Sequence, residues 1–434
     1  GEVSSKRQEL EITGENIDAM DYLAFLPEGT LPREIEPQAL FIDEAKMKFV
    51  REGGDASLAG DVRFSNAQAL VYGTKVEDGR GLLLLAGEDA RIFLRAQTAG
   101  QEASLHGKIA WREAEPSFNF VVESAAFDPS AVLAQSPFEG KVRVLASVYG
   151  TAHDWKIDGA CEAAFGTLYG HALTGAKVKA HFENGLLTAS GGANALGGAI
   201  AGQGLLHADD GSYSAHVEAK DLAGEEIAAL LSAEEISLQG RCDADVVLEG
   251  KGADADGLLA YGTVAVAGAS FRGVEIERVS TSFFKQGELL HFDNLNLSFA
   301  AGGTLVVEGD VRDFGDLDLR FYGTALPLAL ADAFVPEAAA SGTLDIAGAV
   351  RGAAANPMVE ANFEGAAGNA FCQPFDTFHG AIHGSADGIV IDHFSVERGG
   401  KETWIAEGSI GLTGAKRLDV RIDSIGARME DVAA

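Results

Sequence analysis

Cysteine, proline, cations and long apolar runs are all scarce in this chain of 434 residues. The three cysteines, Cys161, Cys242 and Cys372, lie far apart and form no CxxC pair, which excludes a dense disulfide framework. Each is interpreted as a free thiol inside a strand. No apolar run approaches the roughly 18 residues of a membrane-spanning helix, so no transmembrane segment is expected within this sequence.

Cations are outnumbered by acids. The chain has 33 Lys and Arg residues against 65 Asp and Glu residues, which gives a formal charge of −32. Phosphate contacts require Lys and Arg, so the chain is not expected to bind nucleic acid. Anionic membrane surfaces would repel the body of the protein as well. We interpret the charge as a solubilising coat that also suppresses pairing between exposed sheet edges.

Proline is rare, with 10 residues, whereas glycine is abundant, with 54. This combination favours many tight turns and bulges between strands. Apolar residues make up 47% of the chain, which excludes disorder.

Alternation of apolar and polar residues is the dominant local pattern. In Asp316–Phe321 and Leu418–Asp423, every second residue is apolar, and Thr343–Ile346 and Lys141–Val144 show the same period. Strict alternation predicts strands with one apolar and one solvated face. Buried parallel strands would be apolar throughout, so an antiparallel sheet is favoured.

A larger unit recurs about every 100 residues. Helix-like stretches begin near Asn16, Asp128, Gly224, Pro327 and Arg428, and each is followed by glycine-punctuated alternation. A second marker, two glycines separated by five to seven residues, keeps the same spacing. It opens at Gly100, Gly197, Gly302 and Gly400 and closes at Gly107, Gly204, Gly309 and Gly408. Two markers with one period predict a repeat array.

The repeats suggest the following division. Residues 1–15 end a preceding repeat, 16–127, 128–223, 224–326 and 327–427 are four repeats, and 428–434 begin another. Because the pattern is already under way at both ends, we expect a piece of a longer array, with any anchor outside it.

The helices should be short and lie at the repeat boundaries. Asp128 followed by Pro129 predicts an N-cap and a first helical residue, with Val132 and Leu133 buried, while Pro137 and Pro336 end their helices. Helices of this length are not stable alone, so we expect them to pack across the sheet between units. The sequence therefore predicts a mainly β, elongated array with some five to seven strands per unit.

The order of motifs in the last third resembles the TamB and AsmA-like family. Ser341–Gly352 is followed by Asn356-Pro357, then by Phe371–Phe378, Glu407–Leu412 and Leu418–Asp423. The likeness is clearest over residues 230–434.

The resemblance implies a sheet folded lengthwise into a half-pipe, or β-taco, with an apolar inner face. It also implies a periplasmic segment of an inner-membrane-anchored protein, with phospholipid acyl chains as ligands and an outer-membrane barrel as a possible partner. The family supplies no catalytic motif to carry over. Polarity alone selects the residues expected to line the groove, which are Val142, Val144, Leu305, Val307, Leu317, Leu319, Phe321, Leu344, Ile346, Leu418, Val420 and Ile422. The alternative is that these faces close on one another as sandwiches.

Catalytic and metal-binding patterns are weak. The glycines at Gly268 and Gly273 do not match a nucleophile elbow, and the segment between them is interpreted as a turn. On one strand, His379 and His383 would lie about 13 Å apart, too far to share a metal. The pair Asp243 and Asp245 lacks the rest of a calcium loop. We predict no enzyme activity, no catalytic residue, no metal and no cofactor.

Three functions remain open. The first is a conduit whose apolar groove shields acyl chains and passes phospholipids between inner and outer membranes. The second is a scaffold or chaperone that offers a sheet edge to the strands of outer-membrane barrels. The third is a solenoid adhesin, which is disfavoured because no period of 20–30 residues is present.

Overall fold

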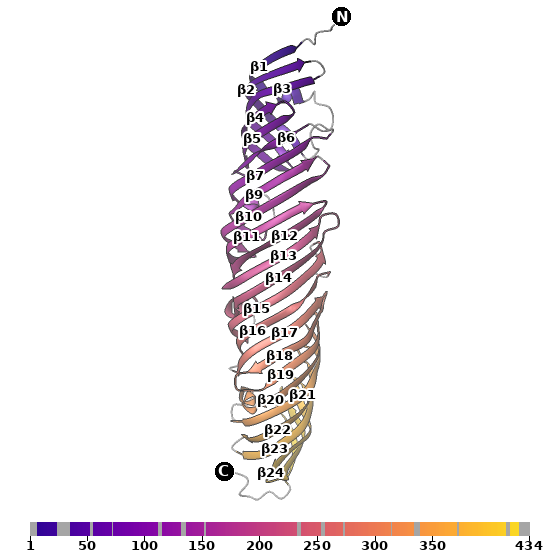
Figure 1. Cartoon of the computed structure of the whole chain (residues 1–434). Coiled ribbons are helices and arrows are strands. Elements are labelled where there is room, and N and C mark those ends of the chain that lie inside the picture. The colour runs from indigo at the N-terminus through magenta and orange to yellow at the C-terminus, as the bar shows by residue number, and fades with distance from the viewer. Residues whose placement is uncertain are drawn as a thin grey trace. The chain divides into compact units, whose positions relative to one another are not determined.

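In the computed structural model the chain forms a 26-stranded antiparallel sheet with a few short helices (Figure 1). This confirms the mainly β fold and agrees with a sheet folded lengthwise. In the part of the chain that the structure describes, the sheet is not closed into a barrel. The described residues are 7–23, 35–52, 55–71, 73–111, 115–131, 136–151, 153–231, 236–252, 257–271, 274–313, 315–333, 339–370, 373–413 and 417–424.

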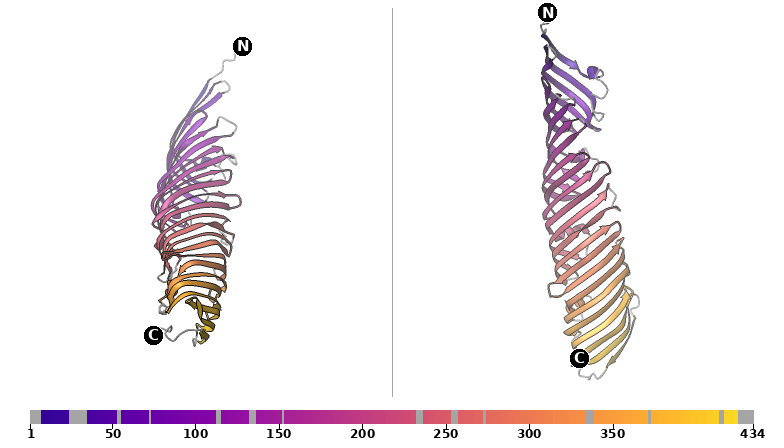
Figure 2. Two further views of the ribbon diagram at one scale, coloured as in Figure 1. Left: turned by 60° about the horizontal axis from the view of Figure 1, so that its bottom comes forward. Right: turned by 45° about the vertical axis from the view of Figure 1, so that its right-hand side comes forward.

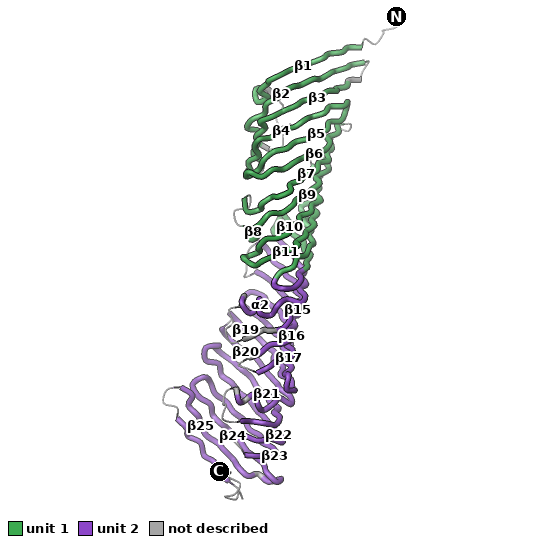
Figure 3. The backbone as a smooth tube through the Cα atoms, turned by 90° about the vertical axis from the view of Figure 1, so that its left-hand side faces the viewer, with its two compact units in different colours: residues 1–195, 201–211 green, residues 196–200, 212–434 purple. Residues whose placement is uncertain are grey.

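Two compact units divide the chain (Figure 3). Unit 1 comprises residues 1–195 and 201–211, and unit 2 comprises residues 196–200 and 212–434. Residues of β13 (Gly198–His207) belong to both. The division into four repeats stays a prediction.

Unit 1 contains most of the first half of the chain. Its elements are β1 (Gln8–Asp18), α1 (Met20–Leu23), β2 (Ile35–Glu52), β3 (Asp55–Val71), β4 (Thr74–Ala86), β5 (Asp89–Thr98), β6 (Gln101–Ala110), β7 (Ser117–Phe127), η1 (Pro129–Ala131), β8 (Phe138–Gly140), β9 (Val142–Thr151), β10 (Trp155–Leu168), β11 (His171–Glu183) and β12 (Leu186–Ala195).

Unit 2 contains the remaining elements. They are β14 (Ser212–Ala223), α2 (Gly224–Leu231), β15 (Ile236–Lys251), β16 (Leu259–Phe271), β17 (Val274–Gln286), β18 (Leu289–Phe299), β19 (Thr304–Arg312), β20 (Asp316–Pro327), η2 (Leu328–Ala333), β21 (Ser341–Ala353), β22 (Met358–Ala370), β23 (Gln373–Ser385), β24 (Gly388–Arg398), β25 (Lys401–Gly411) and β26 (Leu418–Ser424).

Within each unit, strands that follow one another in the chain lie side by side (Figure 2). From β1 to β7, from β9 to β12 and from β14 to β26, each strand pairs antiparallel with the next. The exception is β8, because β7 pairs directly with β9 and β8 pairs with one end of β10. Pairing of this kind needs only short turns, as the glycine content predicts.

The opening glycines of the repeated glycine motif lie in tight turns. Gly100, Gly197, Gly302 and Gly400 have φ values of 75°, 72°, 98° and 72°. Residues with side chains seldom adopt this left-handed region, whereas glycine enters it without strain. The motif therefore marks a turn between strands at each of its four occurrences.

A bulge precedes the helices of unit 2. Asp221 in β14 and Ala325 in β20 have φ values of 55° and 50°, and the pairing register shifts beside each of them. The amide of Asp221 donates to Asp243 Oδ1 at 2.9 Å, and the amide of Ala325 donates to Asp345 Oδ1 at 2.6 Å. Such bulges bend a strand and strengthen its twist. An acid of the next strand therefore holds each bend in place.

Helical segments occur near four of the five expected positions, and each of them is followed by residues outside the described ranges. The helix expected from Asn16 begins at Met20, because β1 continues to Asp18. At Asp128 the expected cap forms, since Oδ1 accepts hydrogen bonds from the Ser130 amide at 3.0 Å and hydroxyl at 2.6 Å. Of the segment 268–273 expected to form a turn, residues 268–271 belong to β16, and residues 272 and 273 lie outside the described residues. Val132, Leu133, Pro336, Cys372 and the helix expected near Arg428 lie outside the described residues.

Few large side chains are fully buried. The accessible surface is 26698 Å², whereas a compact protein of this length exposes about 16,000 Å². Alanines predominate among the buried apolar residues of the described part. Large areas of the sheet faces therefore remain accessible.

Candidate functional site

The register assigns every paired residue to one of two faces, because cross-strand partners point to the same side of a sheet. We call the two sides the apolar face and the polar face. In unit 1, one row of partners on the apolar face crosses β1–β7 and β9–β12 without a charged residue. Its members are Gly14, Ala45, Val62, Leu83, Ile92, Gly107, Phe120, Val148, Ile157, Phe182 and Leu187.

In unit 2, an equivalent row crosses all strands from β14 to β26. Its members are Val217, Val246, Gly262, Phe283, Phe292, Gly309, Leu319, Val350, Val359, Gly384, Ile389, Ile410 and Leu418. Leu418 is exposed and the other members are half-buried. The apolar side chains of this row thus touch one another but are not sealed.

All twelve residues expected to line a groove lie on these apolar faces. Val142 and Val144 are in β9 of unit 1. In unit 2, Leu305 and Ile346 face Gly323 of β20 from either side, and Val307 faces Phe321. The remaining candidates follow the same alternation, and they are Leu317, Leu319, Leu344, Leu418, Val420 and Ile422. Whether they bind lipid stays a prediction.

Phenylalanines that sequence reasoning did not single out extend this surface. Phe363, Phe378 and Phe394 lie on the apolar face of β22–β24, with ring centroids 6.1–6.2 Å apart. A Cβ built on Gly365 would lie 2.1 Å from Phe378 Cε1, and one on Gly380 would lie 2.6 Å from Phe363 Cζ. The rings therefore recline over glycines of the neighbouring strand. A phenylalanine directly opposite a glycine of the neighbouring strand indicates such a contact. The pair can be recognised only when the register between the two strands is known.

The apolar face is covered where strands meet the short helices. Ile227 of α2 packs on a cluster that contains Leu222 and Cys242. Leu330 of η2 packs on a cluster that contains Phe299 and Leu326. These two clusters act as local cores, and they lie beside the half-buried row.

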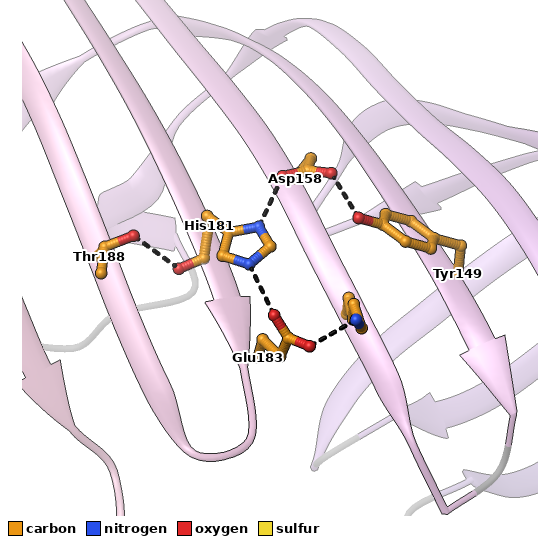
Figure 4. Close-up of polar contacts among 6 residues, drawn as sticks. Tyr149, Asp158, His181, Glu183 and Thr188 are labelled. Atoms are coloured by element: carbon orange, nitrogen blue, oxygen red, sulfur yellow. Dashed lines mark hydrogen bonds and ion pairs between the residues drawn. The ribbon is translucent and has the colours of Figure 1, made fainter.

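The polar face carries paired charges. In unit 1, Asp158 of β10 accepts a hydrogen bond from the Tyr149 hydroxyl at 2.9 Å and lies 2.7 Å from His181 Nδ1 (Figure 4). Glu183 lies 3.4 Å from His181 Nε2 and pairs with Lys156. These contacts tie β9, β10 and β11 together.

The pKa values in this network follow its contacts. Hydrogen bonds to Asp158 and Glu183 raise the pKa of His181 above its usual range. The same contacts lower the pKa of Asp158, and those with Lys156 and His181 lower the pKa of Glu183. The side chains lie at the surface, so we interpret the network as a brace between strands.

Two histidines of neighbouring strands lie closer together than two histidines four residues apart on one strand can. The rings of His379 and His393 are 5.4 Å apart, and Ser395 Oγ lies 3.1 Å from His379 Nε2. His383 pairs instead with Asp392 at 2.9 Å. The sequence groups His379, His383 and His393 as its densest histidine cluster, but spacing along one strand could not place His393 beside His379.

One group of metal-ligand type gathers on the polar face of unit 2. His216, Glu218 and Asp245 present ligand atoms within 4.8 Å of one another, and His216 Nε2 lies 2.8 Å from Asp245 Oδ1. Sequence reasoning weighed Asp245 only with Asp243 of the same strand. The contact with His216 already satisfies one oxygen, and the group is solvent-accessible.

The two described cysteines lie in strands, as expected. Cys161 is half-buried in β10 and Cys242 is buried in β15. Burial raises the pKa of both thiols, which makes them poor nucleophiles.

Among the described residues, none of the helices has the length and apolar character required to cross a membrane. In comparisons with family models, curated proteins and solved structures, nothing matched this chain.

Proposed function

We propose that this chain is a segment of a TamB- and AsmA-like envelope protein whose apolar face shields acyl chains and conducts phospholipids between inner and outer membranes. The observation that carries the proposal is the half-buried row that crosses β14–β26 without a charge. The motif order in residues 341–423 supports the family assignment. The proposed location is the periplasm, in a protein anchored in the inner membrane.

The energetics of acyl transfer favour such a surface. Each methylene withdrawn from water gains about 0.8 kcal/mol, so a sixteen-carbon chain in bare water would cost roughly 12 kcal/mol. Half-buried Leu, Val, Ile and Phe side chains offset much of that cost at every strand. The headgroup stays in water at the open side of the face. Because the rows repeat strand by strand, the energy profile along them is nearly flat, and a lipid can slide.

The length of the row suits this role. The twelve intervals between the thirteen strands, at about 4.8 Å each, give roughly 58 Å within unit 2. One leaflet of a bilayer is about 15 Å of hydrocarbon, or half of the ~30 Å core. Unit 2 could therefore hold several acyl chains in series.

Native mass spectrometry of the purified protein tests the proposal. We expect co-purified phospholipid with the wild type and its loss in the double variant Leu319→Asp/Val420→Asp, with a β-rich far-UV spectrum retained. The matched control is Tyr322→Asp/Ser409→Asp, which adds two acids to the polar face of β20 and β25. Lipid that is retained in the first variant, or lost equally in both, contradicts the groove assignment.

A strand-edge scaffold for outer-membrane barrels is the second candidate. In the described part of the chain β26 pairs only with β25, and its Leu418 and Ile422 side chains are 74% and 62% exposed. An open edge of this kind can accept another strand. Photo-crosslinking from Asp419 to a nascent barrel, with no lipid on the protein, would favour the scaffold. Bound lipid without crosslinks would favour the conduit.

A further inference from the structure

The polar face of unit 1 carries two pairs of like charges between neighbouring strands. Arg80 of β4 lies directly opposite Arg95 of β5, and Arg91 of β5 lies directly opposite Lys108 of β6. Like charges in this position destabilise a sheet. The arrangement is not a consequence of composition, because acids outnumber cations by 65 to 33.

On the polar face of unit 2, cations commonly face acids. Glu308 lies opposite Arg320 and Glu407 lies opposite Arg421. Complementary pairs of this kind stabilise neighbouring strands. The cationic pairs of β4–β6, in contrast, concentrate positive charge in one place.

Three of these four cations have their donors available. Arg80, Arg91 and Arg95 are exposed, and within the described ranges none of them has a hydrogen bond or an ion pair. Lys108 pairs with Asp89 at 3.0 Å. Each guanidinium offers five N–H donors in a fixed fork that matches phosphate oxygens.

A hollow of about 790 Å³ lies over the same strands. Three arginines line it, Arg63, Arg80 and Arg95, together with Asp43 and His106. Leu82 and Phe93 also line it, and they are cross-strand partners two residues along their strands from Arg80 and Arg95. Phe93 is 47% exposed and lies on the polar face, because it alternates with the apolar-face residues of β5. The site thus combines arginines with an apolar centre formed by Leu82 and Phe93.

We propose that this hollow binds the phosphate group of a phospholipid headgroup, with Leu82 and Phe93 against the glycerol and the first methylenes. Arginine binds phosphate through paired, charge-assisted hydrogen bonds. A nucleic acid also carries phosphate, but a chain of net charge −32 repels an extended polyanion. A free phosphate ion would leave the apolar centre uncovered. The site lies on the opposite face from the proposed groove and does not depend on it.

Isothermal titration calorimetry at low salt tests the site with three probes. These are dihexanoyl phosphatidylglycerol below its micelle concentration, glycerol phosphate and inorganic phosphate. We expect binding of the short-chain lipid at least about 10-fold tighter than that of glycerol phosphate, because apolar contacts add to the phosphate contacts. Equal affinity for inorganic phosphate and the lipid would overturn the lipid assignment. Tighter binding of a single-stranded oligonucleotide than of the short-chain lipid would also overturn the lipid assignment.

The double variant Arg80→Gln/Arg95→Gln assigns the binding to this hollow. We expect about a 25-fold loss of affinity for the short-chain lipid, since each cation near a phosphate contributes about fivefold. The matched control Arg320→Gln/Arg421→Gln removes the same charge from the polar face of unit 2, and it should bind as the wild type does. Equal losses in both variants would overturn the site.

Two further measurements separate this proposal from folding effects and from the groove. The Arg80→Gln/Arg95→Gln variant should melt no lower than the wild type, because it relieves the repulsion between Arg80 and Arg95. It should also keep the phospholipid that co-purifies with the wild type. Conversely, Leu319→Asp/Val420→Asp should still bind glycerol phosphate. Loss of glycerol phosphate binding in that groove variant would overturn the assignment to unit 1.

Discussion

At the scale of single residues, histidines of the polar face are held by one carboxylate of the neighbouring strand and one carboxylate of their own strand. His181 lies between Asp158 and Glu183, and His291 lies 2.7 Å from Asp310 Oδ1 and 3.2 Å from Asp293 Oδ1. In both cases the hydrogen-bonded carboxylates raise the pKa of the imidazole. The charge on these histidines therefore changes at a higher pH than it does in an unfolded chain.

The sign of the resulting pH dependence is fixed. Because the folded pKa of His181 is raised, its contribution to stability is complete below the unfolded value of about 6.5 and is lost as pH rises through the folded pKa. We expect Asp158→Asn to lower the pKa of His181, measured by NMR titration of its ring protons. Asp392→Asn, a distant carboxylate beside another histidine, should leave it unchanged. An unaltered His181 titration in Asp158→Asn would contradict the assignment.

At the scale of elements, the bulges of β14 and β20 decide where strands bend and helices begin. Each has a non-glycine residue with positive φ whose amide donates to an acid of the next strand. Asp243 and Asp345, the two acceptors, belong to stretches where the sequence alone suggests only solvated acids. Their spacing of about 100 residues equals the period predicted from the sequence.

Removal of one acceptor measures how much the hydrogen bond at the bulge contributes to the stability of the protein. We expect Asp345→Ala to lower the free energy of unfolding by about 1 kcal/mol, because the Ala325 amide loses a hydrogen bond to a solvent-accessible acid. Urea denaturation gives the value. Asp345→Asn keeps an acceptor and should lose less, and Asp316→Ala removes an acid from the same face as a control. A larger effect at Asp316 would rule out this role for Asp345.

Glycines beneath phenylalanine rings form the second element-scale device. We expect Gly365→Ala to destabilise the protein by about 1–3 kcal/mol, because the new Cβ would lie 2.1 Å from Phe378 Cε1. At Gly159 in β10 the nearest atom to such a Cβ is Ala180 O at 3.9 Å, so Gly159→Ala should be neutral or slightly stabilising. Thermal unfolding of both variants checks the difference. Equal effects would mean that the ring contact does not matter.

Alternation within a strand was sufficient to predict which residues share a face. Leu317, Leu319 and Phe321 are correctly grouped, since a strand has a period of two whatever its neighbours are. Alternation could not place one strand against the next, because bulges such as that at Ala325 shift the register. The ring of Phe363 over Gly380 and the approach of His393 to His379 depend on that register. They were therefore not predictable from the sequence.

At the scale of the whole molecule, the structure is a succession of nearest-neighbour pairings. Within unit 2, each strand from β15 to β25 pairs with the strand before it and the strand after it. In arrays of this kind, stability is close to a sum of local terms. Damage to one strand should therefore remain local.

Hydrogen exchange tests this locality. In Gly365→Ala we expect faster amide exchange in β21–β24, which surround the altered contact, and unchanged exchange in β14–β17. Peptide-resolved mass spectrometry follows both regions in one experiment, and the wild type gives the reference rates. A uniform rise across unit 2 would indicate global cooperativity and contradict an additive array.

The strict succession of partners also restricts how this chain can change in length. One residue inserted within a strand would turn every later side chain of that strand to the opposite side, and would place acids in the path of an acyl chain. A bulge absorbs such an insertion, as the register shift beside Ala325 illustrates. Length variation among descendants of this sequence should therefore accumulate in the hairpin turns, or arise in strands only as paired residues or as new bulges.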